Sequence, residues 1–112
     1  MVYLVGGYKL TYEQTLGWCH SNNLYPPESN ISRYVNRWLR NKSIPTRLLA
    51  CDYQGEPIFL VVTHKRLDNT GTAAQFEPFQ EDLRALSVKE EMKEMDIGAR
   101  DVEFVTVPNP YG

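Results

Sequence analysis

Several features that would name a class of protein are scarce in this chain of 112 residues. It has two cysteines, Cys19 and Cys51, with no pairing pattern, which excludes a disulfide-rich scaffold. No apolar run approaches the roughly 20 residues of a membrane span, and no leader with a charged segment, an apolar segment and a cleavage site opens the chain. These absences predict a soluble, cytoplasmic protein without a membrane partner.

A strong excess of one charge is lacking as well. The 14 acidic and 12 basic residues leave a formal net charge of −2, which is too balanced to favour nucleic acid as a partner on total charge alone. The hydrophobic share of 42% and the charged share of 23% are those of a folded globular chain. We expect a single domain over residues 1–107 and a flexible tail over 108–112, where two prolines cannot continue a strand ladder.

Groups that carry chemistry are also few. Structural zinc sites draw their ligands in close pairs separated by two to five residues. The available thiols and imidazoles, Cys19, His20, Cys51 and His64, do not have that spacing. The sequence therefore predicts no metal and no cofactor, and it contains no evident catalytic constellation.

What the chain does have is a strong hairpin signal over residues 47–65. Two apolar runs flank Gln54-Gly55, a suitable two-residue turn. The second run has five consecutive apolar residues, 58–62, and a strand that is apolar on both faces is normally covered on both, by helices or by another subunit. The register that this turn sets places Cys51 opposite Ile58 and far from His64, which argues against a Cys–His dyad.

Other patterns predict the elements before the hairpin. A β-branched and aromatic run over 1–5 favours a first strand, and Gly6-Gly7 after it would end the strand, bend it or let another backbone come close. Thr11 and Gln14 have capping-box spacing and start a helix. Apolar residues at helical spacing over 31–39 predict a second helix, with Tyr34 on its core-facing stripe.

Two elements are expected after the hairpin. Residues 80–95 favour a helix with a break at Ser87, because the apolar line through Phe79, Leu83 and Leu86 changes phase there. Residues 101–107 favour a last strand. The predicted fold is α+β, a single four-stranded, mostly antiparallel sheet with ferredoxin-like β-α-(α)-β-β-α-β order and one extra helix.

The first functional hypothesis is a binding or self-association module. If the helices covered one face of the sheet, the other would expose an apolar patch larger than monomers usually carry. We expect Phe59 and Val61, or Ile58, Leu60 and Val62 if the faces are reversed, to lie under a protein partner. A symmetric homodimer is the default form of such a partnership.

The alternative from another class is a small metal-free enzyme in which His and Tyr carry out acid–base chemistry in a pocket of a dimeric sandwich. His64, Tyr3 and Tyr8 would be its catalytic residues. An exposed histidine at a strand end is the simpler interpretation of His64.

A further alternative places an anionic partner, either a nucleic acid or an acidic protein, on the second helix. Arg33, Arg37 and Arg40 share one side of that helix, and Lys42 follows them. A solvated helix face explains the same residues without a ligand, so the sequence leaves the function open.

Overall fold

The computed structural model describes residues 2–68, 78–94 and 102–109 of the chain. These residues form four strands, three α-helices and one short 3₁₀ helix. In chain order the elements are β1 (Val2–Leu10), α1 (Tyr12–Ser21), η1 (Glu28–Asn30), α2 (Ile31–Asn41), β2 (Arg47–Tyr53), β3 (Glu56–Asp68), α3 (Leu83–Glu94) and β4 (Glu103–Asn109).

The four strands form one sheet in the order β2-β3-β1-β4, and all neighbouring strands are antiparallel. The prediction of an α+β fold with one antiparallel four-stranded sheet is confirmed. The predicted hairpin is β2–β3, in which Tyr53 pairs with Glu56 across Gln54 and Gly55. Both turn residues have positive φ, 52° and 81°, as in the type I′ turn whose twist matches that of the strands.

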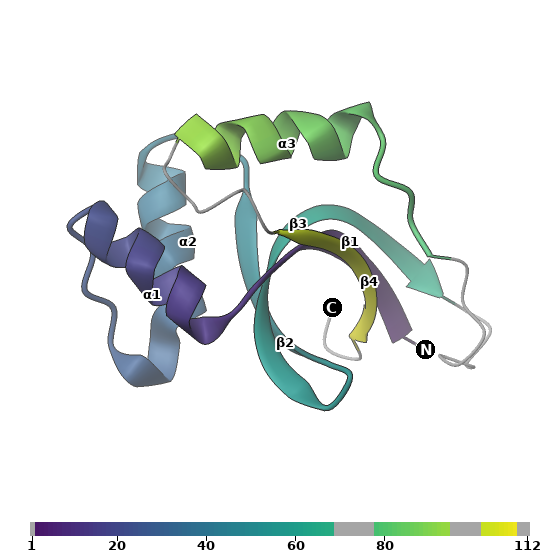
Figure 1. The fold of residues 1–112 in the computed structure, drawn as a ribbon, viewed down its shortest axis with the longest axis horizontal. Helices are drawn as coiled ribbons and strands as arrows, with labels where there is room; N and C mark the ends of the chain where they lie inside the picture. The colour runs from purple at the N-terminus through teal and green to yellow at the C-terminus, as the bar shows by residue number, and fades with distance from the viewer. Residues whose placement is uncertain (1, 69–77, 95–101, 110–112) are drawn as a thin grey trace.

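Both faces of the sheet are covered, but by different means. The three helices lie outside the curved sheet (Figure 1) and pack with one of its faces into the larger apolar cluster. The other face is the inside of a curl, in which Cα atoms of the edge strands β2 and β4 come within 8 Å of each other. This curl encloses a second cluster around Val5, Leu60, Val105 and Val107.

The apolar strand β3 is therefore shielded on both sides within one chain. Val61 is 2% exposed in the helix-side cluster, and Leu60 is fully buried in the inner cluster. Phe59 and Val62 are half-buried against these two clusters, respectively. The expected cover for the second face was a helix or a subunit, whereas the curl of the sheet provides it. Two-sided burial thus does not require a partner, and self-association stays a prediction.

The two helices before the hairpin begin as predicted. Thr11 Oγ1 accepts from the Gln14 amide at 3.1 Å, and Gln14 Oε1 accepts from the Thr11 amide at 2.9 Å, which completes the capping box. In α2 the buried residues are Ile31, Val35 and Leu39. Tyr34, expected to face the core, is 39% exposed.

The third helix differs from the expectation. It is unbroken from Leu83 to Glu94, with no interruption at Ser87. It buries Ala85 and Met92 and leaves Leu83 85% exposed, so its predicted apolar line does not face the core. None of the helices in the described ranges is both long and apolar enough to cross a membrane.

The last strand ends two residues later than predicted. β4 runs to Asn109, and Pro108 lies opposite Leu4 of β1. Because β4 is an edge strand, a proline without an N–H group is tolerated there. The rest of the predicted tail, residues 110–112, lies outside the described residues.

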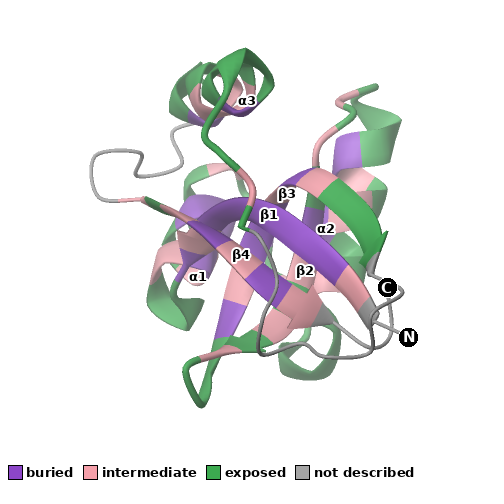
Figure 2. Cartoon of the chain, turned by 90° about the vertical axis from the view of Figure 1, so that its right-hand side faces the viewer, coloured by how far each residue is buried: buried purple, intermediate pink, exposed green. Residues whose placement is uncertain are grey.

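The strand β1 passes through Gly6-Gly7 without ending, and buried residues run along it through the middle of the sheet (Figure 2). A Cβ atom on Gly7 would lie 2.1 Å from the carbonyl oxygen of Val61, and one on Gly6 would lie 2.7 Å from the ring of Phe79. Close approach of another chain segment is therefore the reason for this glycine pair.

Candidate functional site

One side of α2 is a row of exposed arginines. Arg33, Arg37 and Arg40 recur at i, i+4 and i+7, so they fall within an arc of about 60° on the helix surface. The buried stripe of the helix occupies the opposite side. The same sequence pattern that docks α2 on the sheet therefore turns the row of arginines to solvent.

Two further cations follow this row along the chain. Lys42 caps the C-terminus of α2, and Arg47 begins β2. Positions 29–51 contain these five basic residues and no Asp or Glu. We call this surface the basic face; its members are Arg33, Arg37, Arg40, Lys42 and Arg47.

The basic face has no carboxylate in ion-pair contact among the residues that the structure describes. The ion pairs that the described residues do form lie outside the basic face: Lys9–Glu103 at 3.4 Å, Lys93–Glu90 at 3.2 Å and His64–Asp82 at 2.9 Å. One carboxylate reaches the rim, because Glu91 accepts a hydrogen bond from Thr46 at 3.1 Å, beside Arg47. The end of the face that carries Arg33 and Arg37 has no such neighbour among the contacts of the described chain.

Hollows separate the cations along the face. Arg33 and Arg37 line one of about 210 Å³ together with Pro27, Asn30 and Tyr34. At the other end, Arg40 and Arg47 line one of about 290 Å³. Each hollow thus has two arginines in its lining and is open to solvent, which suits a bound anion.

One side chain adds hydrogen bonds between α2 and the edge of the sheet to the packing of the buried stripe. The side-chain amide of Asn36 donates to the Leu48 carbonyl oxygen at 2.8 Å and accepts from the Leu48 amide at 2.7 Å. Since β2 is an edge strand, these groups of Leu48 have no strand partner on that side. Asn36 therefore replaces a missing strand and holds Arg40 on α2 beside Arg47 on β2.

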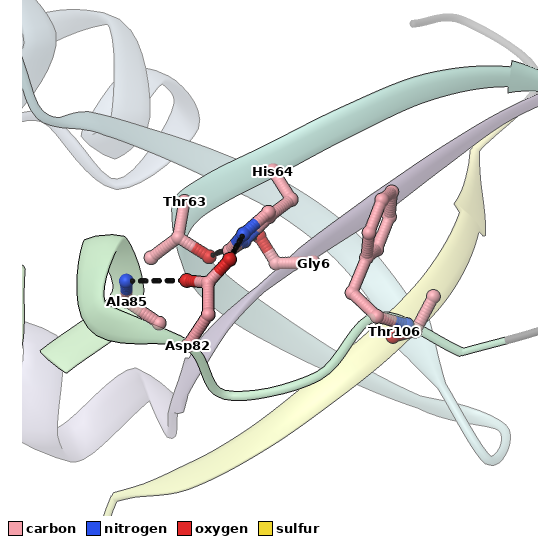
Figure 3. A network of polar contacts seen from close by, with 7 residues as sticks. Gly6, Thr63, His64, Asp82, Ala85 and Thr106 are labelled. Atoms are coloured by element: carbon pink, nitrogen blue, oxygen red, sulfur yellow. Dashed lines mark hydrogen bonds and ion pairs between the residues drawn. The ribbon is translucent and has the colours of Figure 1, made fainter.

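A second polar group surrounds His64, and a β-bulge places it there. Gly6 pairs with His64 and Gly7 with Val62, so Thr63 is an extra residue in β3. A regular strand turns neighbouring side chains to opposite faces, but the bulge turns Thr63 and His64 to the same one. Thr63 Oγ1 and His64 Nδ1 are 2.6 Å apart (Figure 3).

The segment that precedes α3 covers the His64 ring. Phe79 stacks on this ring with centroids 5.2 Å apart, and His64 Nε2 donates to the Asp82 carboxylate at 2.9 Å. Asp82 also accepts from the Ala85 amide at 3.0 Å (Figure 3), so it caps the first turn of α3. We call Thr63, His64, Phe79 and Asp82 the His64 latch.

A hydroxyl, an imidazole and a carboxylate are the groups of a catalytic relay, but here the hydroxyl is enclosed. Thr63 is 4% exposed and donates to the Gly6 carbonyl oxygen at 3.2 Å. The bond from His64 in turn holds the pKa of Asp82 below its ordinary value. The contacts of the latch thus join α3 to the sheet and present no nucleophile.

The two tyrosines predicted as acid–base partners lie on opposite faces of β1. Tyr8 is fully buried on the helix side and donates to Glu81 at 2.7 Å; burial and this bond raise the pKa of its phenol. The rings of Tyr8 and His64 both contact Phe104, at centroid distances of 5.5 and 6.1 Å. Tyr3 is two residues before Val5 in β1, and side chains two apart in a strand point to the same face, so Tyr3 faces the inside of the curl. The structure brings Tyr8, but not Tyr3, to the neighbourhood of His64.

The cysteines lie apart from both polar groups. Cys19 is buried in the helix-side cluster, and Cys51 packs against the inner one. Burial raises the pKa of both thiols, that of Cys51 to about 11. In the ranges that the structure covers, no three His, Cys, Asp or Glu side chains gather in the way that a metal site requires.

Sequence reasoning missed the residues that complete these sites. Asp82 is a cap-type residue directly before a helix, a signal that a helix start at Gln80 concealed. Asn36 gave no signal, because its partner is a backbone group 12 positions away.

Comparisons of the chain with models of protein families, with curated proteins and with solved structures find no match.

Proposed function

We propose that the protein is a non-catalytic binding module that docks an anionic partner on its basic face. The observation that carries this proposal is the row of arginines on α2, which has no carboxylate in ion-pair contact within the described residues. A guanidinium in that state keeps its planar set of donors for a phosphate or a carboxylate. Arginines three and four positions apart are neighbours on a helix surface, with Cβ atoms about 5–6 Å apart. The Debye length is about 8–10 Å, so their charges act on an approaching anion together.

A face that only keeps the protein in solution is the simpler interpretation. Such faces usually mix both signs of charge. Positions 29–51 contain five cations and no anion although the whole chain has a net charge of −2. This segregation supports a docking role, since a local field steers a partner more than the total charge does.

Salt dependence tests the proposal. Fluorescence anisotropy would follow binding of a labelled heparin fragment, a labelled poly-glutamate peptide and a labelled oligonucleotide. For about four phosphate contacts, the affinity for the oligonucleotide should fall about 50-fold between 50 and 200 mM salt. Changing Arg33, Arg37 and Arg40 together to Gln should abolish binding at 200 mM and flatten the remaining salt dependence.

The control removes the same charge from another helix. α3 carries three cations outside the basic face, and Gln would replace all of them: Arg84, Lys89 and Lys93. This variant should bind about as well as the parent, because the docking surface is intact. Equal weakening of both triple variants, or no binding of any polyanion at 50 mM salt, would remove the proposal.

We also propose a ferredoxin-like layout for the fold. The element order and the sheet order β2-β3-β1-β4 support it, with α2 as the extra helix. Such a layout hosts many functions and argues for none. A symmetric dimer remains a separate prediction, and light scattering that shows a monomer at tens of micromolar would withdraw it.

A further inference from the structure

Tyr34 is an aromatic side chain exposed within the basic face. It is 39% exposed, and its position on α2 is about 60° from that of Arg37 around the helix axis. It lines the hollow of about 210 Å³ with Arg33 and Arg37. It also lines an adjoining hollow of about 180 Å³ with Arg37 and Trp38. Tyr34 and Arg37 are therefore walls that two neighbouring hollows share.

The two aromatic residues in this place have different surroundings. Trp38 is half-buried, packs edge-to-face on Trp18 with centroids 5.9 Å apart, and has the Lys42 ammonium 5.9 Å from its ring centroid. Within the described chain, the Tyr34 ring has no such stacking or cation contact. An aromatic surface that shares a hollow with two arginines thus remains available to a ligand.

We infer that the anionic partner of the basic face is a single-stranded nucleic acid, with one base stacked on Tyr34 and the adjoining phosphates on Arg33 and Arg37. This inference rests on the proposed docking function. Proteins that bind single strands combine a cationic track with aromatic side chains on which successive bases stack. A row of arginines on α2 with an exposed ring at its edge has that composition.

Two other polyanions fit the exposed ring less well. In a duplex the bases are stacked on one another, so their faces are not accessible to Tyr34. An acidic protein would neutralise the arginines without using the ring. Both serve as competing ligands in the test.

The experiment compares a ligand with bases and a ligand without them. Fluorescence anisotropy at 50 mM salt would measure binding of an oligo-dT of about 15 nucleotides, an abasic phosphodiester chain of the same length, a duplex and poly-glutamate. The oligo-dT should bind about 5- to 160-fold more tightly than the abasic chain, the range that stacking of one base supplies. Tyr34→Leu should remove this difference, whereas Tyr34→Phe should keep it.

Matched variants separate the two levels of the proposal. Tyr12 is exposed to a similar extent, 40%, and lies outside the basic face, so Tyr12→Leu should leave the preference for bases unchanged. Arg37→Gln should weaken the oligo-dT and the abasic chain by the same factor. Circular dichroism would verify that each variant is folded.

The outcomes differ for the two claims. If the abasic chain binds as tightly as oligo-dT, or if duplex or poly-glutamate binds best, the inference of a single-stranded nucleic acid is overturned while anionic docking stands. If Tyr34→Leu leaves the preference for bases intact, the assignment of Tyr34 is overturned. If no polyanion binds, the proposed function fails together with the inference.

Discussion

Replacing Asn36 should destabilise the whole fold, because its side chain pairs with the edge of the sheet. Its amide group forms two hydrogen bonds with Leu48, at 2.7 and 2.8 Å. Leu48 is 2% exposed. In Asn36→Ala, the amide and carbonyl groups of Leu48 lose their partner at a partly buried place, where water can replace it only in part.

The size of the effect follows from these two bonds. Each contributes about 1 kcal/mol, and the cost rises toward 3 kcal/mol for a buried group left unpaired. Ala returns about 0.5 kcal/mol through its higher helix propensity. We expect a net loss of about 2 kcal/mol in the free energy of unfolding, and for a domain of this size a melting temperature lower by about 8 °C.

Urea unfolding followed by tryptophan fluorescence would measure this loss as a midpoint lower by about 1 M or more. Asn36→Asp should be as damaging, because it places a carboxylate oxygen against the Leu48 carbonyl. Asn41→Ala, an exposed change on the same helix, is the control and should be nearly neutral. A loss below about 0.5 kcal/mol for Asn36→Ala would refute the inference that the amide pairing holds α2 to the sheet.

Three further predictions concern the sheet and its polar groups. Gly7→Ala should prevent stable folding, because its Cβ would lie 2.1 Å from the Val61 carbonyl oxygen; soluble expression and a cooperative melt like the parent's would contradict this. The bond from His64 lowers the pKa of Asp82, so the ionised Asp82 carboxylate stabilises the fold above about pH 4 and its contribution is lost as the pH falls further; Asp82→Asn should show a smaller loss of stability than the parent between about pH 5 and 3, and parallel curves would count against the latch. Since burial raises the pKa of Cys51 to about 11, about one thiol in a thousand is ionised at pH 8, and iodoacetamide should label it far more slowly in the native protein than in urea.

Short-range patterns in the sequence accounted for most of the individual elements. The Gln54-Gly55 turn predicted both the hairpin and its register, because few two-residue turns fit the twist of two strands. The pairing of Thr11 with Gln14 predicted the start of α1, because both bonds of a capping box join residues three apart. Such signals are reliable since the interacting groups lie within one turn of each other.

The candidate site was predicted in part for the same reason. Helical spacing alone placed Arg33, Arg37 and Arg40 on one exposed side. Tyr34 was assigned to the core, because its spacing from Ile31 and Trp38 is that of an apolar stripe. It lies at the edge of that stripe, where the position of the neighbouring segment and not the period decides exposure.

The sequence by itself therefore determined the class of the fold, the hairpin, two helices and the row of arginines. The tertiary structure alone decided what covers the second face of β3, since the curl that brings β2 toward β4 depends on twist summed over four strands. It also decided the environment of His64, because one unpaired residue, Thr63, reverses the side to which the next side chain points. Both outcomes depend on contacts between residues far apart in the chain, and the spacing of residue types along the sequence does not report such contacts.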